Sequence, residues 1–314
     1  MSYLGIDIGG TAAKLGIVDR MGRVIREDSC DVSFDGYDTP IMTTVIKKLD
    51  EFAAANHIDI CGLDGIGVSA TGQIDTPSGT VIGSAGHIKG WEGTRIKEEL
   101  ESRYTVRTTV VNDANCVAIA EHWIGRAKGA CNALVITIGT GVGGGIISDS
   151  KILLGSKGVA GEIGHFSLDC HGRLCSCGNR GCYEQYASMT ALVNTVRQQK
   201  QLLKQYQLRE EEINGKRIFE LAAEEMAPML EIVDEWIDFI ACGLVGLTHI
   251  FAPEIILIGG AVSRQQELFI DKLRRKVLAR VMPVFRSTTR LEAAALGNSA
   301  GLVGAVCYCM NNSN

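Results

Sequence analysis

Residues 3–25 read YLGIDIGGTAAKLGIVDRMGRVI, a succession of apolar runs separated by residues typical of tight turns. This pattern predicts strands over residues 3–8, 14–19 and 23–26. Residues 133–154, ALVITIGTGVGGGIISDSKILL, follow the same order of strand, Gly/Thr turn, strand, turn and strand. We interpret the two stretches as a weak internal repeat, which predicts two similarly built halves.

Outside these two stretches the predicted strands alternate with helices. Apolar residues at a spacing of three to four predict a helix over residues 39–56. The same criteria predict strands at 63–69, 108–111 and 254–258, and helices within 91–104 and at 115–125, 187–203, 217–227, 229–250, 264–281 and 297–310. Such alternation is typical of α/β layers. We expect a small N-terminal α/β domain from residues 1–118 and about 296–314, and a large α/β domain from residues 119–295.

The composition excludes several classes of protein. The chain has 314 residues, 46% hydrophobic and 21% charged, which suits about two folded domains and disfavours disorder. A net charge of −5 disfavours a nucleic-acid partner, because such a partner selects a basic surface. The opening MSYLGIDIGG carries no basic segment or cleavage site, so we expect no signal peptide. The apolar run at residues 239–253 is too short to span a bilayer, which predicts a cytoplasmic protein without a membrane partner.

Residues 161–184, GEIGHFSLDCHGRLCSCGNRGCYE, contain a cluster of potential metal ligands in loop composition. A cytoplasmic chain is not expected to form disulfides, and a redox pair would need Cys-x-x-Cys at a helix start. Three thiolates and an imidazole suit zinc, so we predict a structural zinc site. Its ligands would be His165, Cys175, Cys177 and Cys182. Unpaired loop cysteines are the alternative, and Cys170 and His171 are spare candidate ligands.

Three glycine turns each follow an apolar strand. They are Gly9-Gly10-Thr11, Gly139-Thr140-Gly141 and Gly259-Gly260-Ala261. Glycine lets backbone N–H groups approach phosphate oxygens, so three such turns predict a nucleotide site, although each could simply close a hairpin. Residues 139–144 also match G-x-G-x-x-G, but that fingerprint opens a helix, whereas residues 145–149 are predicted to form a strand. A dinucleotide oxidoreductase is therefore disfavoured, and the sequence has no Walker A motif.

Taken together, these segments resemble the ROK family of sugar kinases, within the actin/hexokinase-type ATPase superfamily, over essentially the whole chain. The most specific match is residues 161–165, GEIGH, with the cysteine segment 175–184, which is similar to the family's E-x-G-H and zinc signature. The three glycine turns resemble its two phosphate motifs and its adenosine motif. Residues 111–115, VNDAN, resemble the segment that carries the catalytic aspartate.

The resemblance implies a two-domain, actin-like ATPase fold of the α/β class, with a duplicated ribonuclease-H-like core and an interdomain cleft. It implies ATP and Mg²⁺ as cofactors and transfer of the γ-phosphoryl group of ATP to a sugar hydroxyl. It also implies a homodimer or a dimer of dimers. The zinc ion would be structural and would hold the loop that presents the substrate-binding residues.

Residue roles follow from this resemblance and from the chemistry of phosphoryl transfer, which is mostly positioning and charge neutralisation. Asp113 is the expected catalytic base, because a sugar hydroxyl must lose its proton as the P–O bond forms; capping of the next helix is the alternative. The substrate-binding residues would be Gly72, Asn112, Asp113, Glu162, His165 and Glu184, with a solvated surface charge as the alternative for Glu184. The cofactor-binding residues would be Asp7, Gly9, Gly10, Thr11, Lys14, Gly139, Thr140, Gly141, Gly259 and Gly260.

The sequence constrains the identity of the sugar less closely. Many glucokinases of the family carry an Asn in the loop that matches residues 84–91, where this chain has Gly86 and His87. Glucose, phosphorylated on its 6-OH, is the first expectation. N-acetylmannosamine, N-acetylglucosamine, fructose, allose and β-glucosides are alternatives. A sugar-responsive repressor is disfavoured because the first strand begins at Tyr3 and leaves no room for a helix-turn-helix domain; a sugar sensor without kinase activity stays open.

Overall fold

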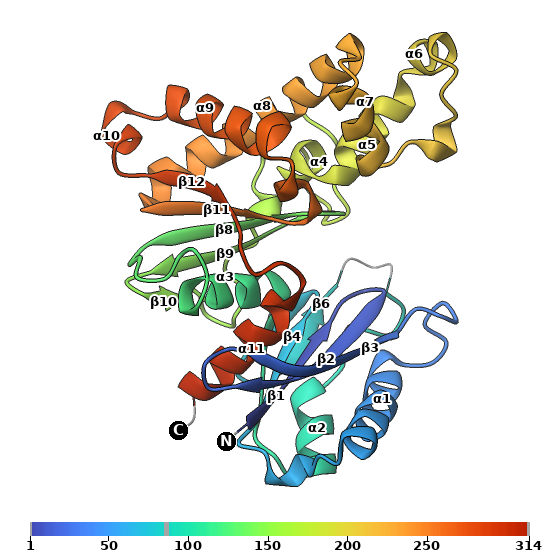
Figure 1. Cartoon of the computed structure of the whole chain (residues 1–314), viewed down its shortest axis with the longest axis vertical. Helices are drawn as coiled ribbons and strands as arrows, with labels where there is room; N and C mark the ends of the chain where they lie inside the picture. The colour runs from blue at the N-terminus through green and yellow to red at the C-terminus, as the bar shows by residue number, and fades with distance from the viewer. Residues whose placement is uncertain (1, 85–87, 313–314) are drawn as a thin grey trace. The chain divides into compact units, whose positions relative to one another are not determined.

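The computed structural model describes residues 2–84 and 88–312, so His87 lies outside the described residues (Figure 1). The chain divides into two compact units. Unit 1 comprises Met1–Cys131, Gly145–Gly161 and Ala295–Asn314, and unit 2 comprises Asn132–Gly144 and Glu162–Ala294. The domain boundaries expected at residues 118 and 295 stay a prediction.

Unit 1 is built on a five-stranded sheet with the strand order β3-β2-β1-β4-β7. The strands are β1 (Ser2–Ile8), β2 (Ala12–Asp19), β3 (Val24–Asp31), β4 (Ile66–Ala70) and β7 (Thr108–Asn112). The first three pair antiparallel through tight turns, whereas β4 runs parallel to β1 and β7 runs parallel to β4. The strand–turn–strand pattern predicted for residues 3–25 is therefore present.

Side-chain alternation gives this sheet two apolar faces. On β1, Leu4, Ile6 and Ile8 enter a core shared with α1 (Ile41–Asn56) and α2 (Ile96–Tyr104). Tyr3 lies on the other face, in a cluster with Leu302 of α11 (Ala300–Asn311). Helix α3 (Asp113–Trp123) packs beside α11, and a short hairpin, β5 (Gln73–Asp75) with β6 (Thr80–Gly83), follows β4 (Figure 1).

The second sheet has the strand order β10-β9-β8-β11-β12. Its strands are β8 (Ala133–Ile138), β9 (Val142–Ser148), β10 (Lys151–Ile152), β11 (Ile255–Gly259) and β12 (Arg290–Ala293), of which β8 and β12 both run parallel to β11. The helices of unit 2 are α4 (Glu184–Ala187), α5 (Met189–Gln198), α6 (Lys200–Gln205), α7 (Gly215–Ala223), α8 (Ala227–Phe251), α9 (Asp271–Arg280) and α10 (Pro283–Arg286). Since strands and helices alternate in both units, the predicted α/β class is confirmed.

Two predicted helices differ from those observed. The helix expected over residues 187–203 is interrupted at Gln199, whose ψ of 62° is not helical, and α6 continues after it. The helix expected over residues 264–281 becomes regular only from Asp271, after a π-helical turn at Gln266–Ile270. The glycine-rich segment at residues 139–144 runs into strand β9, which begins at Val142, and not into a helix, so a dinucleotide fingerprint is absent there, as expected.

Within residues 2–84 and 88–312, no helix combines the length and the apolar character needed to cross a membrane.

Candidate active site

Asp7 lies at the end of β1, on the face that packs against α11. Its Oδ1 accepts a hydrogen bond of 2.6 Å from Ser69 Oγ, because Ser69 is its parallel partner on β4. Gly301, near the start of α11, leaves room for the carboxylate, since a Cβ there would lie 2.4 Å from Asp7 Cγ. Burial raises the pKa of the Asp7 carboxyl, while the Ser69 hydrogen bond and the charge of Lys14 act in the opposite direction. The result is an oriented carboxylate that a nearby cation would stabilise.

The turn between β1 and β2 holds the first group of predicted cofactor-binding residues. Gly9 N–H donates to Ala12 O at 2.9 Å, and Tyr37 Oη donates to Gly10 O at 2.7 Å. Lys14 pairs with Asp7 across the two strands, and its Nζ donates to Asn298 O at 2.9 Å. The turn is therefore fixed by contacts within unit 1, with Thr11 exposed at its tip.

Asn112 and Asp113 join the end of β7 to the start of α3. Asn112 Oδ1 caps the helix by accepting from Ala114 N at 3.0 Å and Asn115 N at 3.2 Å. Its Nδ2 donates to Gly72 O at 2.9 Å and to Asp113 Oδ1 at 3.0 Å. The helix cap is thus Asn112, although Asp113 Oδ1 also accepts from Ala114 N at 2.8 Å. Asn112 holds both Gly72 and Asp113 in place.

In unit 2, two of the predicted glycine turns lie side by side at the ends of β8 and β11. Gly139 N–H donates to Gly141 O at 3.0 Å. Gly260 has φ of 93°, and a Cβ there would lie 2.1 Å from Ile138 O, so only glycine fits at this close approach. Gly141 lies close to the Glu184 carboxylate, because a Cβ at this position would be 2.8 Å from Glu184 Oε2.

The four predicted zinc ligands come together in unit 2. The ligand atoms of His165, Cys175, Cys177 and Cys182 all lie within 4.8 Å of one another. Cys177 Sγ and Cys182 Sγ are 3.6 Å apart, which is too far for a disulfide. Two sulfur ligands of a tetrahedral zinc ion at ~2.3 Å each would lie about 3.8 Å apart. The residues therefore fit a closed metal site, and Cys170 is exposed and outside the cluster.

Two carboxylates flank the histidine of this cluster. His165 Nδ1 lies 3.7 Å from Cys175 Sγ and 3.8 Å from Glu184 Oε1, whereas Nε2 lies 4.0 Å from Glu162 Oε2. The Glu184 side chain is only 17% exposed and accepts from Cys175 Sγ at 3.3 Å. Glu184 is therefore not a solvated surface charge, and it connects the cysteine cluster to the Gly139–Gly141 turn.

The sequence model of the ROK family matches residues 3–311. The chain belongs to the ROK family. Glucokinase from Thermotoga maritima is 30% identical over 97% of this chain and 96% of that protein. β-Glucoside kinase from Listeria monocytogenes is 32% identical over 100% of this chain and 99% of that protein. Family and relatives together support a ROK sugar kinase, at the level of reaction class.

A solved structure agrees with this assignment. The crystal structure of a ROK family glucokinase from Streptomyces griseus, in complex with glucose and AMPPNP, is 31% identical to this chain. The two superpose with a TM-score of 0.81, covering 97% of this chain and 98% of that chain. The predicted actin-like ATPase fold is confirmed.

ROK relatives also include proteins named as regulators. The xylose repressor from Bacillus subtilis is 27% identical over 96% of this chain and 75% of the repressor. Membership of the ROK family therefore leaves the individual substrate open.

Three neighbours of the predicted site in this ROK chain were not found from the sequence. Ser69 is a fully buried serine in an apolar strand, Gly301 is one glycine within a helix, and Gln185 Nε2 donates to Cys175 Sγ at 3.5 Å. A polar residue in the run IGVSA at residues 66–70 was the available signal for Ser69. The other two follow from tertiary contacts alone.

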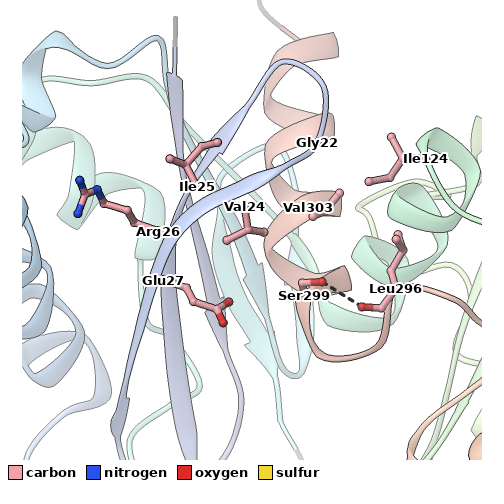
Figure 2. Close-up of a pocket in the computed structure, with 9 residues that line it drawn as sticks. All are labelled: Gly22, Val24, Ile25, Arg26, Glu27, Ile124, Leu296, Ser299 and Val303. Atoms are coloured by element: carbon pink, nitrogen blue, oxygen red, sulfur yellow. Dashed lines mark hydrogen bonds between the residues drawn. The ribbon is translucent and has the colours of Figure 1, made fainter.

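A cavity of about 380 Å³ in unit 1 contains none of the predicted site residues (Figure 2). Val24, Ile124, Leu296 and Val303 give it an apolar lining, and Ser299 Oγ donates to Leu296 O at 3.0 Å. It lies beside the edge strand β3, whose Arg26 and Glu27 also line it.

Proposed function

We propose that this ROK chain is an ATP-dependent, hexokinase-type phosphotransferase that transfers the γ-phosphoryl group of ATP to the 6-OH of glucose. The observation that carries the proposal is the way Asn112 fixes Asp113 at the start of α3. The glucokinase relative from Thermotoga maritima and the glucose-bound structure from Streptomyces griseus support glucose as the acceptor.

Asp113 acts as the general base in this proposal. A sugar hydroxyl is a weak nucleophile, so its proton must leave as the bond to phosphorus forms, and such assistance contributes about 10²–10⁴-fold to the rate. Asn112 holds the carboxylate by donating to Oδ1, which restricts the orientations of Asp113 before the sugar binds. Gly72, bonded to the same Asn112, would let the sugar approach the backbone.

The glycine turns would receive the nucleotide. The turns at Gly9, Gly10 and Thr11 and at residues 139–141 suit phosphate oxygens through backbone N–H groups other than those of Gly9 and Gly139, which close the two turns. Gly259 and Gly260 suit the adenosine side. Mg²⁺, when bound, would neutralise charge on the phosphates. Asp7 is the carboxylate that would orient it or its water shell, since Mg²⁺ binds a few carboxylates and keeps waters. Lys14 stands beside Asp7 on the adjacent strand.

The cysteine cluster would hold a structural zinc ion with His165, Cys175, Cys177 and Cys182 as ligands. Zinc would fix the loop from which Glu162, His165 and Glu184 bind sugar hydroxyls. Oxygen acceptors at several fixed positions suit a ring of hydroxyl donors.

The proposal also includes a cytoplasmic location and a homodimer or dimer of dimers. It places the domains at residues 1–118 with 296–314 and at residues 119–295.

Other sugars are the main competitors of glucose. The Listeria monocytogenes relative favours a β-glucoside kinase, and N-acylhexosamine kinase or fructokinase are further alternatives. A sugar-sensing regulator without kinase activity is the non-enzyme alternative, favoured by the repressor relative.

The test is ADP release from Mg-ATP across glucose, fructose, N-acetylmannosamine, N-acetylglucosamine and β-glucosides. We expect the highest kcat/KM with glucose. Faster turnover of another sugar would identify that sugar as the substrate and would leave the proposed kinase reaction unchanged. Sugar binding without turnover of any member of the panel would favour the regulator.

A further inference from the structure

A second cavity in unit 1, of about 190 Å³, carries polar groups that the proposed reaction does not use. It lies between the turn after β5, the start of β7, the segment after β10 and the last turn of α11, with Lys97 of α2 at its wall. None of the residues predicted for catalysis, sugar, nucleotide or metal lines it. We call it the Lys97 cavity.

Thr76 lines this cavity and carries an unsatisfied polar atom just behind its wall. Its Oγ1 is buried and has no hydrogen-bond partner within the described residues. Gly158 packs directly against this hydroxyl, because a Cβ there would lie 2.2 Å from Thr76 Oγ1. A buried hydroxyl without a partner costs free energy, so a ligand that bonds to Thr76 after a rotation of its side chain would recover that cost.

The charge that lines the cavity is positive. Lys97 is its sole charged lining residue, and no Asp or Glu is among the lining residues. Among residues 2–84 and 88–312, its ammonium has no ion pair or side-chain hydrogen bond. Glu101, one turn further along α2, instead accepts from the Thr108 N–H at 2.9 Å. Tyr308 and Ser156 add hydroxyl groups to the wall.

Size restricts the ligand. A buried water needs ~10–15 Å³ on a comparable measure, so the cavity is an order of magnitude larger than one water site. It is smaller than the range of about 300–1,000 Å³ that is typical of sites for drug-sized ligands, which favours a small ligand. An unpaired ammonium with surrounding hydroxyl donors suits a compact anion that accepts several hydrogen bonds.

From these features we propose that the Lys97 cavity binds a small oxyanion of the phosphate type, either inorganic phosphate or the phosphate group of a small phosphorylated sugar. Lys97 supplies the charge, and Thr76, Ser156 and Tyr308 supply hydrogen bonds. The proposal is independent of which sugar the active site uses, and of whether the chain is a kinase.

The cavity is separate from the candidate active site within unit 1. Thr109 lines it near the start of β7, whereas Asp113 follows the end of that strand. At about 3.3 Å per residue the four intervening steps place the two ~13 Å apart along the chain. Thr76 is likewise separated from Gly72 by the whole of β5 (Gln73–Asp75). Binding can therefore be measured while the active site is occupied.

The experiment titrates the full-length chain with inorganic phosphate and, separately, with glucose 6-phosphate, followed by ³¹P NMR and calorimetry. Glucose and a non-hydrolysable ATP analogue are present at saturation to block the active site. Wild-type protein should show saturable binding of at least one probe. Loss of a charged hydrogen bond costs about tenfold or more in affinity, so Lys97→Met should weaken binding by that factor and Thr76→Val by less.

Lys157→Met is the matched control, because Lys157 is exposed, belongs to the same loop as Ser156 and does not line the cavity. It should bind the probes like wild type, and Lys97→Arg should retain most of the affinity. Binding of only one probe would identify which source of phosphate the cavity accepts. The absence of saturable binding, or equal affinity in Lys97→Met and wild type, would overturn the proposal. Melting temperatures of all variants check that each is folded.

Discussion

Asp113 owes its proposed role to its neighbour as much as to its own chemistry. Asn112 uses both ends of its amide, with Oδ1 on the start of α3 and Nδ2 on Gly72 O and Asp113 Oδ1. Replacing Asp113 by Asn removes the basic oxygen but keeps an acceptor and a similar shape. Such a change isolates proton transfer from sugar binding.

We predict that Asp113→Asn lowers kcat by about 10²–10⁴-fold, the usual contribution of a general base, and leaves the sugar KM within a few-fold of wild type. Steady-state ADP release with the preferred sugar measures both constants. Asp59→Asn is the control, because Asp59 is exposed and caps a short helical turn that an Asn can also cap. A kcat close to wild type in Asp113→Asn would remove Asp113 as the base.

We expect the buried Asp7 carboxylate to lower the stability of the fold while it supports kinase activity. Burial raises its pKa above the ordinary value of 3.8, so the folded chain binds this proton more tightly than the unfolded chain. Stability should therefore fall as pH rises from 3.8 through the folded pKa, and the penalty should be complete above the folded pKa. Asp7→Asn removes the charge while its Oδ1 can still accept from Ser69.

We accordingly expect metal-free Asp7→Asn to melt above wild type at neutral pH, by about 2–4 °C for each kcal/mol recovered, and to lose kinase activity. The difference in melting temperature should shrink as pH falls toward 3.8. Scanning fluorimetry across pH measures it, with Asp59→Asn as the control. A variant that melts below wild type at neutral pH would contradict the sign of this effect.

At the scale of elements, the sequence predicted the features that depend only on residues close together in the chain. The hairpins of β1–β3 and the glycine turns are sequence-local, and the four cluster ligands lie within residues 165–182. The sequence did not reveal β12, whose four residues become a strand only by pairing with β11. It also did not reveal Ser69, which meets Asp7 because β4 pairs in parallel with β1 at one register. The helix break at Gln199 was also not predicted, because no Gly or Pro lies at or beside this residue.

Helix α3 is tied to the segment before α11 by one buried carboxylate. Glu121 is fully buried, and its Oε1 accepts from Ala295 N at 2.7 Å and Leu296 N at 2.8 Å. Its Oε2 accepts from Arg126 N at 2.9 Å. Removing this side chain would leave three backbone donors without their acceptor.

Glu121→Ala should therefore lower the free energy of unfolding by about 3 kcal/mol or more, because three hydrogen bonds to a charged group are lost and each contributes about 1.5–3 kcal/mol. Glu121→Gln keeps one oxygen acceptor and should lose less. Urea denaturation followed by circular dichroism gives both values. Equal stability of Glu121→Ala and wild type would mean that the segment finds other partners.

The cysteine loop makes a prediction about metal content. Cys177→Ser and Cys182→Ser should each reduce bound zinc, measured by mass spectrometry of the metal, and should raise hydrogen exchange in residues 161–184. Structural zinc contributes about 10–16 kcal/mol in small peptides, so even a fraction of that orders a loop. Cys170→Ser, an exposed cysteine in the same loop, is the matched control. Full zinc content with a normal sugar KM in Cys182→Ser would contradict the role of the cluster.

At the scale of the whole molecule, unit 1 is discontinuous in the sequence. Its sheet forms from residues before 113, yet one face of that sheet is covered by α11, which begins at residue 300. Gly304 allows this helix to lie unusually close to α3, since a Cβ there would be 1.8 Å from Cys116 O. The N-terminal unit therefore needs the last helix before its core is complete.

A chain that ends at Ala294 tests this dependence. It lacks Leu302, Val303 and Val306, and burying such side chains contributes about 1.5–3 kcal/mol each, or about 5–9 kcal/mol in sum. That loss is comparable to the whole stability of a typical domain, about 5–15 kcal/mol, so unit 1 should unfold. Trp123 packs in the clusters that α11 completes, whereas Trp236 of unit 2 packs on Phe269, with ring centroids 5.2 Å apart. In variants that keep one tryptophan, the truncated chain should show solvent-exposed Trp123 fluorescence and native-like Trp236 fluorescence. A native, cooperative transition reported by Trp123 would show instead that the β3-β2-β1-β4-β7 sheet and helix α3 fold without α11.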